Sequence, residues 1–371
     1  MSEPQSSSRN IAFHTPYPLN RKATAASGIR PVKMREAFEE LGYTVWEVTG
    51  RARERRAAAR RVRAAMKAGT RFEFCYSEAS TMPTTMTEPH HLPLHPLLDV
   101  LFLRDLHRAG TKVGLFYRDC YWAFEGYGDG LNPVKKHAAL AAYRFDLLGY
   151  RDSLDVLYTG SVKMGPWIKV GNRITKKELP SGHVMPTVSE PPTTGVRLFY
   201  VGGLGHHYRL PLLFEAVKTL SEQGVDVTLT ACASKQQWEE EKDAYLPFLC
   251  DAITVVHESG EALNARYAAC NIASLFVEPS SYREIAMPMK LFEYIGQGRP
   301  VLASVPTASG HTVAEQGLGW AIPYTLEDVT STLRRLAENP DEIMAMHGQV
   351  MAKREQHTWL ARARQVAEDL R

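Results

Sequence analysis

Short runs of β-branched and aromatic residues alternate with longer polar-rich segments from Ile11 to the C-terminus. This alternation is typical of βαβ units, in which helices join parallel strands. In the first half it predicts strands at Ile11–Thr15, Thr44–Val48, Phe72–Ser77, Lys112–Tyr117 and Asp155–Thr159. In the second half it predicts strands at Val196–Val201, Val225–Ala231, Ile253–Val256, Ile272–Val277, Val301–Ser304 and Gly319–Ile322. We therefore expect an α/β protein with two Rossmann-like domains, whose parallel sheets face each other across a cleft.

The helices are expected between these strands. A helix over Pro31–Leu41 would carry Pro at its start and Gly42 just past its end, where glycine adopts a left-handed cap without steric cost. Helical patterns also cover Leu210–Ser221, Glu261–Ala269, Lys290–Gln297, Leu326–Ala337, Pro340–Lys353 and Thr358–Leu370.

Domain boundaries follow from composition. Residues 1–10 are polar and Ser-rich, and we expect them to be disordered. An N-terminal acceptor-binding domain is expected over 11–182 and a C-terminal nucleotide-binding domain over 196–355. Residues 183–195 are Pro-rich without apolar periodicity, which indicates a linker with a hinge that closes on binding. The last helix, over 356–371, is long enough to cross back to the N-terminal domain.

Composition narrows the functional classes. A chain of 371 residues can hold two cores, and a net charge of +3 gives no polyanion-binding signature, so no nucleic-acid partner is expected. The five cysteines are scattered singly, which indicates reduced cytosolic thiols. The His90–His91 and His206–His207 pairs lack metal-ligand spacing, so no metal site is proposed. Without an apolar leader or a bilayer-length apolar stretch, we expect a cytoplasmic protein, soluble or peripheral on the inner face of the membrane.

A glycine loop is the strongest local feature. The strand Val196–Val201 runs into Gly202-Gly203-Leu204-Gly205 and then into a helix that starts near Pro211. Glycines let the backbone approach a ligand closely, and a helix N-terminus offers free N–H groups to a diphosphate. NAD is disfavoured, because a third glycine is missing and no acidic residue follows the strand Val225–Ala231.

A second feature spans Glu278–Val301, where a polar loop opens a helix that carries Lys290 and Glu293 one turn apart. Such a cation could hold a phosphate, while the carboxylate holds a ribose or sugar hydroxyl. The same spacing also fits a simple salt bridge on a solvated helix face.

This stretch closely resembles the donor-binding loop and helix of GT-B glycosyltransferases, notably family-4-like enzymes of the family 1/4 group. The matching residues are Glu293, the turn Tyr294 to Gln297, and Gly298-Arg299-Pro300-Val301. The resemblance covers nearly the whole chain. It is specific in the second domain and mainly architectural in the first.

The resemblance implies a GT-B enzyme that takes a nucleotide-diphosphate sugar, a UDP- or GDP-sugar, as donor, with no permanently bound cofactor and no metal. It assigns Glu293 to the ribose, Lys290 to the diphosphate, and His257 and Glu258 to the border of the base. The transferred sugar would contact the backbone around Ala286–Pro288. The full implied donor set is Gly203, Leu204, Arg209, His257, Glu258, Ala286, Met287, Lys290 and Glu293.

The chain departs from the family pattern in two ways: in the spacing of its paired glutamates and in the positions of its positive charges. Glu284, a candidate catalytic residue, lies one residue further from Glu293 than the paired glutamates of that family do. Gly203 and Tyr208 stand where the family tends to have Arg and Lys, so Lys290 and Arg209 must supply the positive charge. Inverting GT-B enzymes share the Pro-x-Lys-x-x-Glu-Tyr pattern, which leaves the stereochemical outcome open.

Strand ends of the first domain supply the acceptor-side candidates. Arg118 and Asp119 follow the strand Lys112–Tyr117, and in open α/β sheets ligands bind at the carboxyl ends of strands. Asp119 could act as a general base on an acceptor hydroxyl, or it could pair with Arg118 and merely order the loop.

Further acceptor-side candidates share the same positions. Tyr121, Trp122 and Phe124 could stack on a sugar ring or a lipid-linked acceptor, or they could belong to the core. Glu78 and His14 also follow strands, and each could instead have a structural role.

The segment Arg51–Lys67 holds eight basic residues against a single Glu54. A basic helix of this kind can dock on an anionic membrane surface, although most such runs are solvated faces.

We expect a metal-independent, hexosyltransferase-like glycosyltransferase of surface polysaccharide or glycoconjugate biosynthesis, acting on a glycan or lipid-linked acceptor, with the donor held between the two domains. One rival is a nucleotide-sugar epimerase on the same fold. Another is a catalytically silent GT-B partner subunit. The aromatic N-terminal residues favour transfer over epimerisation, and the Lys290/Glu293 pair argues against a silent subunit.

Overall fold

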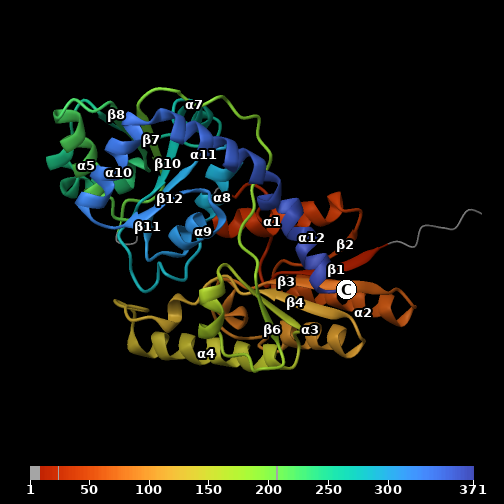
Figure 1. Ribbon diagram of the computed structural model, residues 1–371. Helices are drawn as coiled ribbons and strands as arrows, with labels where there is room; N and C mark the ends of the chain where they lie inside the picture. The colour runs from red at the N-terminus through yellow and green to blue at the C-terminus, as the bar shows by residue number, and fades with distance from the viewer. Residues whose placement is uncertain (1–8, 24, 206–207) are drawn as a thin grey trace, which may run out of the picture. The chain divides into compact units, whose positions relative to one another are not determined.

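The chain forms two compact units in a computed structural model, which describes residues 9–23, 25–205 and 208–371. The N-terminal unit comprises Met1–Gly182 with Trp359–Arg371, and the C-terminal unit comprises His183–Thr358 (Figure 1). Residues 1–8, most of the segment expected to be disordered, lie outside the described residues.

The N-terminal unit is built on a six-stranded parallel sheet with the order β2-β1-β3-β4-β5-β6. Its strands are β1 Asn10–His14, β2 Thr44–Val48, β3 Phe72–Glu78, β4 Lys112–Phe116, β5 Val156–Thr159 and β6 Thr175–Glu178. The first five confirm the predicted strands to within one residue at each end. The sixth was not predicted, because Thr-Lys-Lys-Glu at a sheet edge has no apolar pattern.

Helices cover both faces of this sheet. Helices α1 (Ala26–Glu40) and α12 (Trp359–Asp369) pack against each other on one face. The other face carries α2 (Ala52–Lys67), α3 (Leu98–Arg108) and α4 (Pro133–Arg151) in adjacent positions (Figure 1). Short 3-10 turns complete the unit at η1 Thr84–Met86, η2 Tyr121–Ala123 and η3 Val162–Trp167.

The predicted start of the first helix at Pro31 is wrong, because α1 begins five residues earlier, at Ala26. Pro31 lies inside the helix, where its missing N–H cannot bond the carbonyl of Ser27. That carbonyl accepts a hydrogen bond from the Arg118 guanidinium instead. The predicted helix end is confirmed: Gly42 follows with φ +82° and closes the C-terminus.

The C-terminal unit has a second six-stranded parallel sheet, with the order β12-β11-β10-β7-β8-β9. Its strands are β7 Val196–Val201, β8 Val227–Cys232, β9 Ile253–Val256, β10 Ile272–Leu275, β11 Val301–Val305 and β12 Gly319–Pro323. All six were predicted, with ends within two residues. Together the two sheets confirm the α/β fold class.

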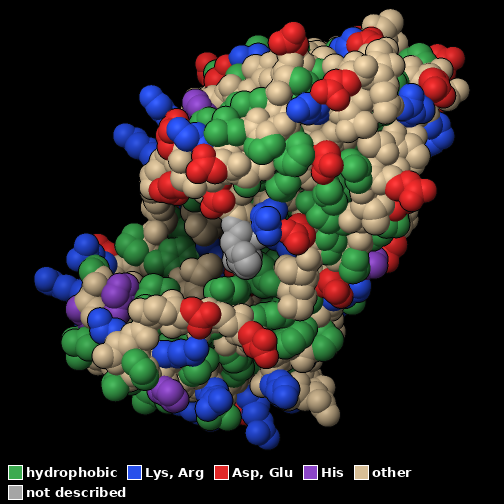
Figure 2. Space-filling view, turned by 90° about the vertical axis from the view of Figure 1, so that its left-hand side faces the viewer, with side chains coloured by type: hydrophobic (Ala, Val, Ile, Leu, Met, Phe, Trp, Pro, Cys, Tyr) green, Lys and Arg blue, Asp and Glu red, His purple; other side chains and the backbone are tan. Residues whose placement is uncertain are grey.

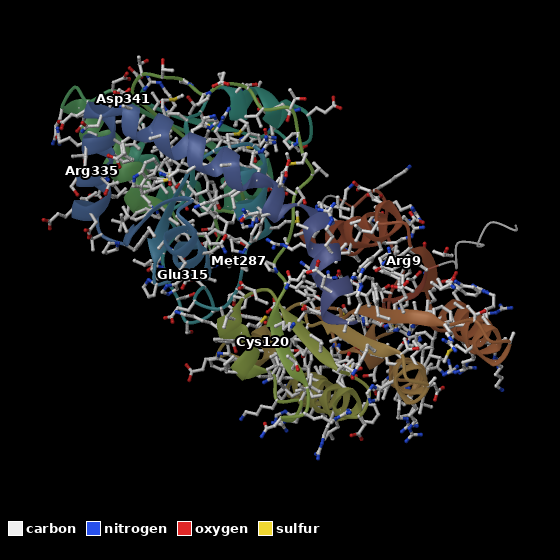
Figure 3. The ribbon with its side chains drawn as sticks, turned by 45° about the vertical axis from the view of Figure 1, so that its right-hand side comes forward. Arg9, Cys120, Met287, Glu315, Arg335 and Asp341 are labelled. Atoms are coloured by element: carbon white, nitrogen blue, oxygen red, sulfur yellow. The ribbon has the colours of Figure 1, made fainter. Side chains whose placement is uncertain are left out.

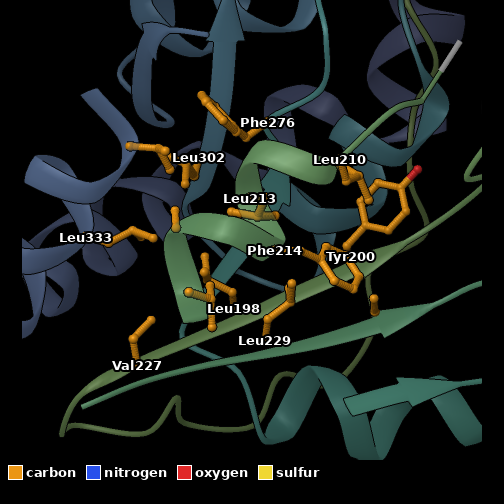
Figure 4. Packing of buried hydrophobic residues seen from close by; sticks show 14 of the residues in the cluster. Leu198, Tyr200, Leu210, Leu213, Phe214, Val227, Leu229, Phe276, Leu302 and Leu333 are labelled. Carbon is orange, nitrogen blue, oxygen red and sulfur yellow. The ribbon is translucent and has the colours of Figure 1, made fainter. Parts of the chain in front are cut away.

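Each face of the second sheet has its own apolar core. Leu213 and Phe214 of α5 pack with Leu333 of α10 over Leu229 of β8 (Figure 4). In the second core, Leu291 and its neighbours in α8 pack with residues of α7 and α9. The helices of the unit are α5 Pro211–Glu222, α6 Lys235–Glu241, α7 Ala262–Ala268, α8 Met289–Gly296, α9 Ala308–Gln316, α10 Leu326–Glu338 and α11 Pro340–Lys353, with short turns η4 Lys242–Ala244, η5 Leu246–Phe248 and η6 Arg354–His357.

Residues 184–195 form neither helix nor strand, and side chains of the C-terminal unit hold them in place. The buried Arg299 donates to the carbonyl of Ser189 at 2.8 Å, and Arg354 donates to that of Pro186 at 2.9 Å. The amide of Asn271 donates to the carbonyl of Pro192 at 3.1 Å. This Pro-rich segment is therefore bonded along its length to one unit.

All five cysteines are free, and only Cys250 is not fully buried. Among the described residues, no helix is both long and apolar enough to cross a bilayer.

Candidate functional site

Each sheet has one place where the strand order reverses direction. In the C-terminal sheet, the chain leaves β7 toward β8 on one side and reaches β10 on the other. In the N-terminal sheet, the corresponding place lies between β1 and β3. Loops diverge at such a switch point, so a crevice forms beyond the carboxyl ends of its strands, where open α/β sheets bind ligands.

The glycine loop follows β7 at the C-terminal switch point, and Lys290 packs on it. A Cβ atom at Gly202 would lie 2.6 Å from the Tyr200 hydroxyl and 2.8 Å from Cε of Lys290. Only glycine leaves room there for the lysine stem. Leu204 is buried, and its carbonyl accepts from the Tyr245 hydroxyl at 3.2 Å, while Tyr200 donates to the carbonyl of Gly203. The loop is thus a fixed platform beside an ammonium group.

Lys290 and Arg283 bring two positive charges to the aromatic ring of Tyr208. The Lys290 Nζ lies 6.0 Å from the ring centroid, and the Arg283 Cζ lies 3.8 Å from it. Within the described chain, no carboxylate lies within ion-pair distance of either cation. Neither charge is therefore neutralised by an ion pair there.

Glu293 is half-buried one turn after Lys290 on α8. Burial raises the pKa of its carboxyl, and the nearby Lys290 ammonium only partly offsets that rise. The next residue, Tyr294, accepts a hydrogen bond from the backbone N–H of Val201 at 3.1 Å, which fixes α8 to the end of β7. The helix that carries Lys290 and Glu293 is therefore held against the glycine loop.

The segment after β10 closes this part of the unit. Glu284 and Ala286 are half-buried, and their backbone N–H groups bond the carbonyls of Ser280 and Tyr282. Met287 precedes α8 on the same turn (Figure 3). Arg209, expected to supply positive charge, is exposed, and its Nη1 lies 3.4 Å from Oε2 of Glu278.

The two residues expected near the base lie after β9. His257 is exposed, and its Nδ1 is 2.9 Å from the carbonyl oxygen of Ala233. Glu258 accepts two hydrogen bonds from Arg266, at 2.6 and 2.9 Å, which lower the pKa of its carboxyl. His206 and His207 lie outside the described residues.

At the N-terminal switch point, Glu78 is fully buried among cations. Its Oε1 lies 3.3 Å from Nε of Arg30, and its Oε2 lies 3.4 Å from Nη2 of Arg118. The hydroxyl of Tyr76 also donates to Oε1 at 2.9 Å. Arg118 additionally donates to the hydroxyl of Tyr17 and to the helix carbonyl described above. Glu78 is thus paired with both arginines, one carboxylate against two cations.

His14 ends β1 in a second closed network. Its Nδ1 is 2.8 Å from Oγ of Ser77, and its Nε2 is 2.9 Å from Oδ1 of Asp99. Arg55 from α2 bonds both oxygens of Asp99, and neighbouring groups hold the pKa of that carboxyl below its ordinary value despite burial. A ligand could reach His14 only by displacing one of these partners.

Asp119 and the aromatic residues after β4 are half-buried. Oδ1 of Asp119 accepts from the backbone N–H of Tyr121 at 2.9 Å, which orders the following turn. Trp122 donates from Nε1 to the hydroxyl of Tyr117 at 2.9 Å and stacks on Tyr143 with ring centroids 5.0 Å apart. One edge of Trp122 remains on the wall of a cavity.

The basic segment Arg51–Lys67 consists of α2 and its N-cap Arg51, and its charges divide into three groups. Arg55 is buried and has a structural role in the Asp99 network. Arg63 pairs with Asp105 of α3 at 2.8 Å. The remaining basic side chains of the segment are exposed: Arg51, Arg53, Arg56, Arg60, Arg61 and Lys67. Within the described ranges, no cluster of three or more His, Cys, Asp or Glu side chains could hold a metal ion.

Residues 195–339 match the family model described as glycosyl transferases group 1. The matched region lies within the C-terminal unit, His183–Thr358. The match confirms the resemblance drawn from the loop and helix around Lys290 and Glu293. No curated protein matches the chain.

Solved structures with the GT-B fold match over nearly the full chain. Anabaena HepE, solved with UDP and glucose, shares 12% identity at a TM-score of 0.61 and covers 98% of this chain and 99% of its own. WaaG, a glycosyltransferase involved in lipopolysaccharide biosynthesis, shares 14% identity at a TM-score of 0.56, with 97% and 99% covered. A glycosyltransferase from Rickettsia africae shares 11% identity at a TM-score of 0.58, with 98% of each chain covered. At this identity the likeness establishes the GT-B fold.

Sequence reasoning about the donor-side residues missed Arg283. This side chain is 6% exposed and lies over Tyr208 next to the Lys290 ammonium. The sequence feature that could have identified it is its position, as an arginine inside the polar loop that precedes α8. Its linear distance from the glycine loop gave no indication that the two would meet.

Proposed function

We propose that this protein is a glycosyltransferase that moves a sugar from a nucleotide-diphosphate sugar, a UDP- or GDP-sugar, to an acceptor hydroxyl. The observation that carries the proposal is the pairing of the glycine loop with Lys290 and Arg283 at the C-terminal switch point. The match to group 1 glycosyltransferases and the UDP-bound state of HepE support it. Surface polysaccharide or glycoconjugate assembly is the proposed setting, as for WaaG.

In this reaction the bond between the anomeric carbon and the diphosphate oxygen breaks, and negative charge develops on the leaving diphosphate. Lys290, Arg283 and the amides of the glycine loop would stabilise that charge. Electrostatic stabilisation of this kind is usually the largest single contribution to enzyme catalysis. These groups do the work of a metal ion, so we propose metal-independent transfer. Glu293 would hold the ribose.

The acceptor oxygen forms the new bond to the anomeric carbon and loses its proton. Asp119, at the end of β4, is the proposed base, and Glu284 is a second candidate for a charge-stabilising role near the sugar. The half-buried aromatic residues after β4, together with Arg118, are proposed to face the acceptor.

We also propose that the protein works as a peripheral protein on an anionic membrane surface. The exposed arginines of α2 support this, since Asp105 compensates only Arg63 among the basic residues that project outward.

Replacing Lys290 by Ala tests the donor site. The loss of a charge-assisted contact of about 1.5–3 kcal/mol should weaken UDP or GDP binding roughly tenfold or more, without lowering the melting temperature. Isothermal titration calorimetry with both nucleotides measures the effect. Lys218→Ala on α5 removes an equal charge from the same unit and should leave binding unchanged. If Lys290→Ala binds both nucleotides as tightly as wild type, the assignment is wrong.

A further inference from the structure

The N-terminal unit contains an open cavity of about 820 Å³ between α4 and the segments that follow β4 and β5. Its walls include Trp122 from η2, Leu147 and Leu148 from α4, and Trp167 from η3. Ligand pockets in proteins typically measure about 300–1,000 Å³, so the volume suffices for a large ligand group. The proposed roles of the acceptor-side residues use only one edge of this cavity, at Trp122.

The cavity combines an apolar wall with positive charge, and this combination limits the kind of ligand that fits. Most of its wall is aromatic or aliphatic, and Trp167 stacks on Phe124 with ring centroids 4.4 Å apart, which holds that wall in place. The charged residues in the wall are Arg144 and Lys169, and both are exposed cations. An apolar wall with two positive charges and no carboxylate complements a ligand that has a long apolar part and an anionic group.

The outer side of α4 extends the apolar wall. Val134, Ala138, Ala141, Phe145 and Leu148 are exposed and follow one another at alternating spacings of four and three residues, which places them on one helix face. Leu148 is 65% exposed and belongs to both the stripe and the cavity wall. The cavity is therefore continuous with an exposed apolar surface.

The exposed charges of α4 itself are of one sign. The only carboxylate within α4 is Asp146, and it is buried. The exposed charged side chains of the helix are Lys135, Arg144 and Arg151. Figure 2 shows hydrophobic side chains intermixed with basic and some acidic ones over the N-terminal unit, in the lower part of the picture. This surface suits a ligand that arrives from an anionic lipid layer.

We infer that the cavity binds the lipid part of a lipid-phosphate-linked acceptor, with the hydrocarbon chain against Leu148 and Trp167 and the phosphate beside Arg144 and Lys169. The inference rests on the proposed glycosyl transfer and narrows its acceptor from any glycan to a sugar carried on a lipid phosphate. The cavity follows the same strand end as Asp119 and adjoins Trp122, so the lipid would hold the acceptor sugar on the acceptor side of the unit.

Binding of farnesyl phosphate to the full chain tests this inference, with farnesol and inorganic phosphate as matched probes. Titration calorimetry below the micelle-forming concentration should show farnesyl phosphate binding at least tenfold tighter than either probe, since only it engages both the wall and the cations. Leu148→Gln should weaken farnesyl phosphate and farnesol alike by roughly tenfold, because it replaces apolar surface that the hydrocarbon chain would cover with a polar amide. Arg144→Gln should weaken farnesyl phosphate alone.

Val134→Gln is the matched control, because Val134 is 76% exposed on the same apolar stripe but is not part of the cavity wall. It should bind farnesyl phosphate as wild type does. Equal weakening by Val134→Gln and Leu148→Gln would mean adsorption to the helix surface and would overturn the inference. Farnesyl phosphate binding no tighter than farnesol or inorganic phosphate would also overturn it. UDP and GDP titrations on the same samples separate the two proposals, since they report the donor site alone.

Discussion

The two units share one architecture but treat charge at their switch points in opposite ways. Beyond β7 and β10, Lys290 and Arg283 have no carboxylate partner within ion-pair distance among the described residues. Beyond β1 and β3, Glu78 lies between Arg30 and Arg118, and His14 is bonded to Asp99. The same topological position thus holds cations without an ion-pair partner in one unit and paired charges in the other.

This difference indicates what each position can do. Available cations next to a glycine platform can attract an anion without first breaking a protein contact. A buried, compensated cluster resists any ligand that would remove a partner, because an unpaired charge in a protein interior is costly. We therefore expect charges at the C-terminal switch point to affect ligand binding, and those at the N-terminal switch point to affect stability.

The largest expected effect is on stability, from Glu78→Gln. This change leaves Arg30, which is 4% exposed, facing a neutral amide, and breaking a buried pair typically costs about 3–5 kcal/mol. Urea unfolding should show a loss of that size, while UDP or GDP binding by the folded protein stays normal. Lys290→Ala should do the reverse. The comparison fails if both variants lose similar stability.

Asp119→Asn is expected to have the next largest effect, on turnover. The amide keeps the size of the side chain and can still accept from the backbone of Tyr121, but it cannot take a proton. A general base predicts a loss of roughly 100-fold or more in turnover, with donor affinity and melting temperature little changed. A lowered melting temperature with near-normal turnover would assign Asp119 to the fold.

Much of the sheet structure could be predicted from the sequence. The bounds of β2, β7 and β9 match the prediction to the residue, because each is a short β-branched or aromatic run between polar segments. The helix α11 matches as well, since Pro340 and the polar segment after Lys353 mark its ends. The order of the strands within each sheet could not be predicted from the sequence pattern. The structure shows which strands flank each switch point.

What could not be predicted depended on tertiary contacts. No helix was predicted over α4, because apolar residues occur all around it: one set is buried, another lines the cavity, and a third is exposed to solvent. Pro31 misled the start of α1, because a distant arginine satisfies the carbonyl that proline leaves free. The partners of Glu78 could not be inferred either, since they come from α1 and from the loop after β4.

The smallest expected effect is on membrane binding by the exposed arginines of α2 in the N-terminal unit. An Arg60→Gln, Arg61→Gln, Arg63→Gln variant should bind anionic vesicles roughly 30-fold more weakly than wild type at low salt. Near an anionic surface each exposed arginine contributes about 1 kcal/mol, and Arg63 less because Asp105 already compensates it. The difference should shrink as salt rises, since the Debye length falls to about 10 Å at 0.1 M. Cosedimentation with vesicles measures it.

The matched control removes the same charge from the other unit, by changing Lys218, Arg334 and Arg335 to Gln. If net charge alone drives adsorption, this variant should lose as much vesicle binding as the α2 variant does, because both lower the charge by the same amount. If the α2 face is the docking surface, the control should bind like wild type, and neutral vesicles should bind none of the three proteins appreciably. Equal partitioning of wild type and the α2 variant onto anionic vesicles at low salt would instead show that the cations of α2 are simply solvated.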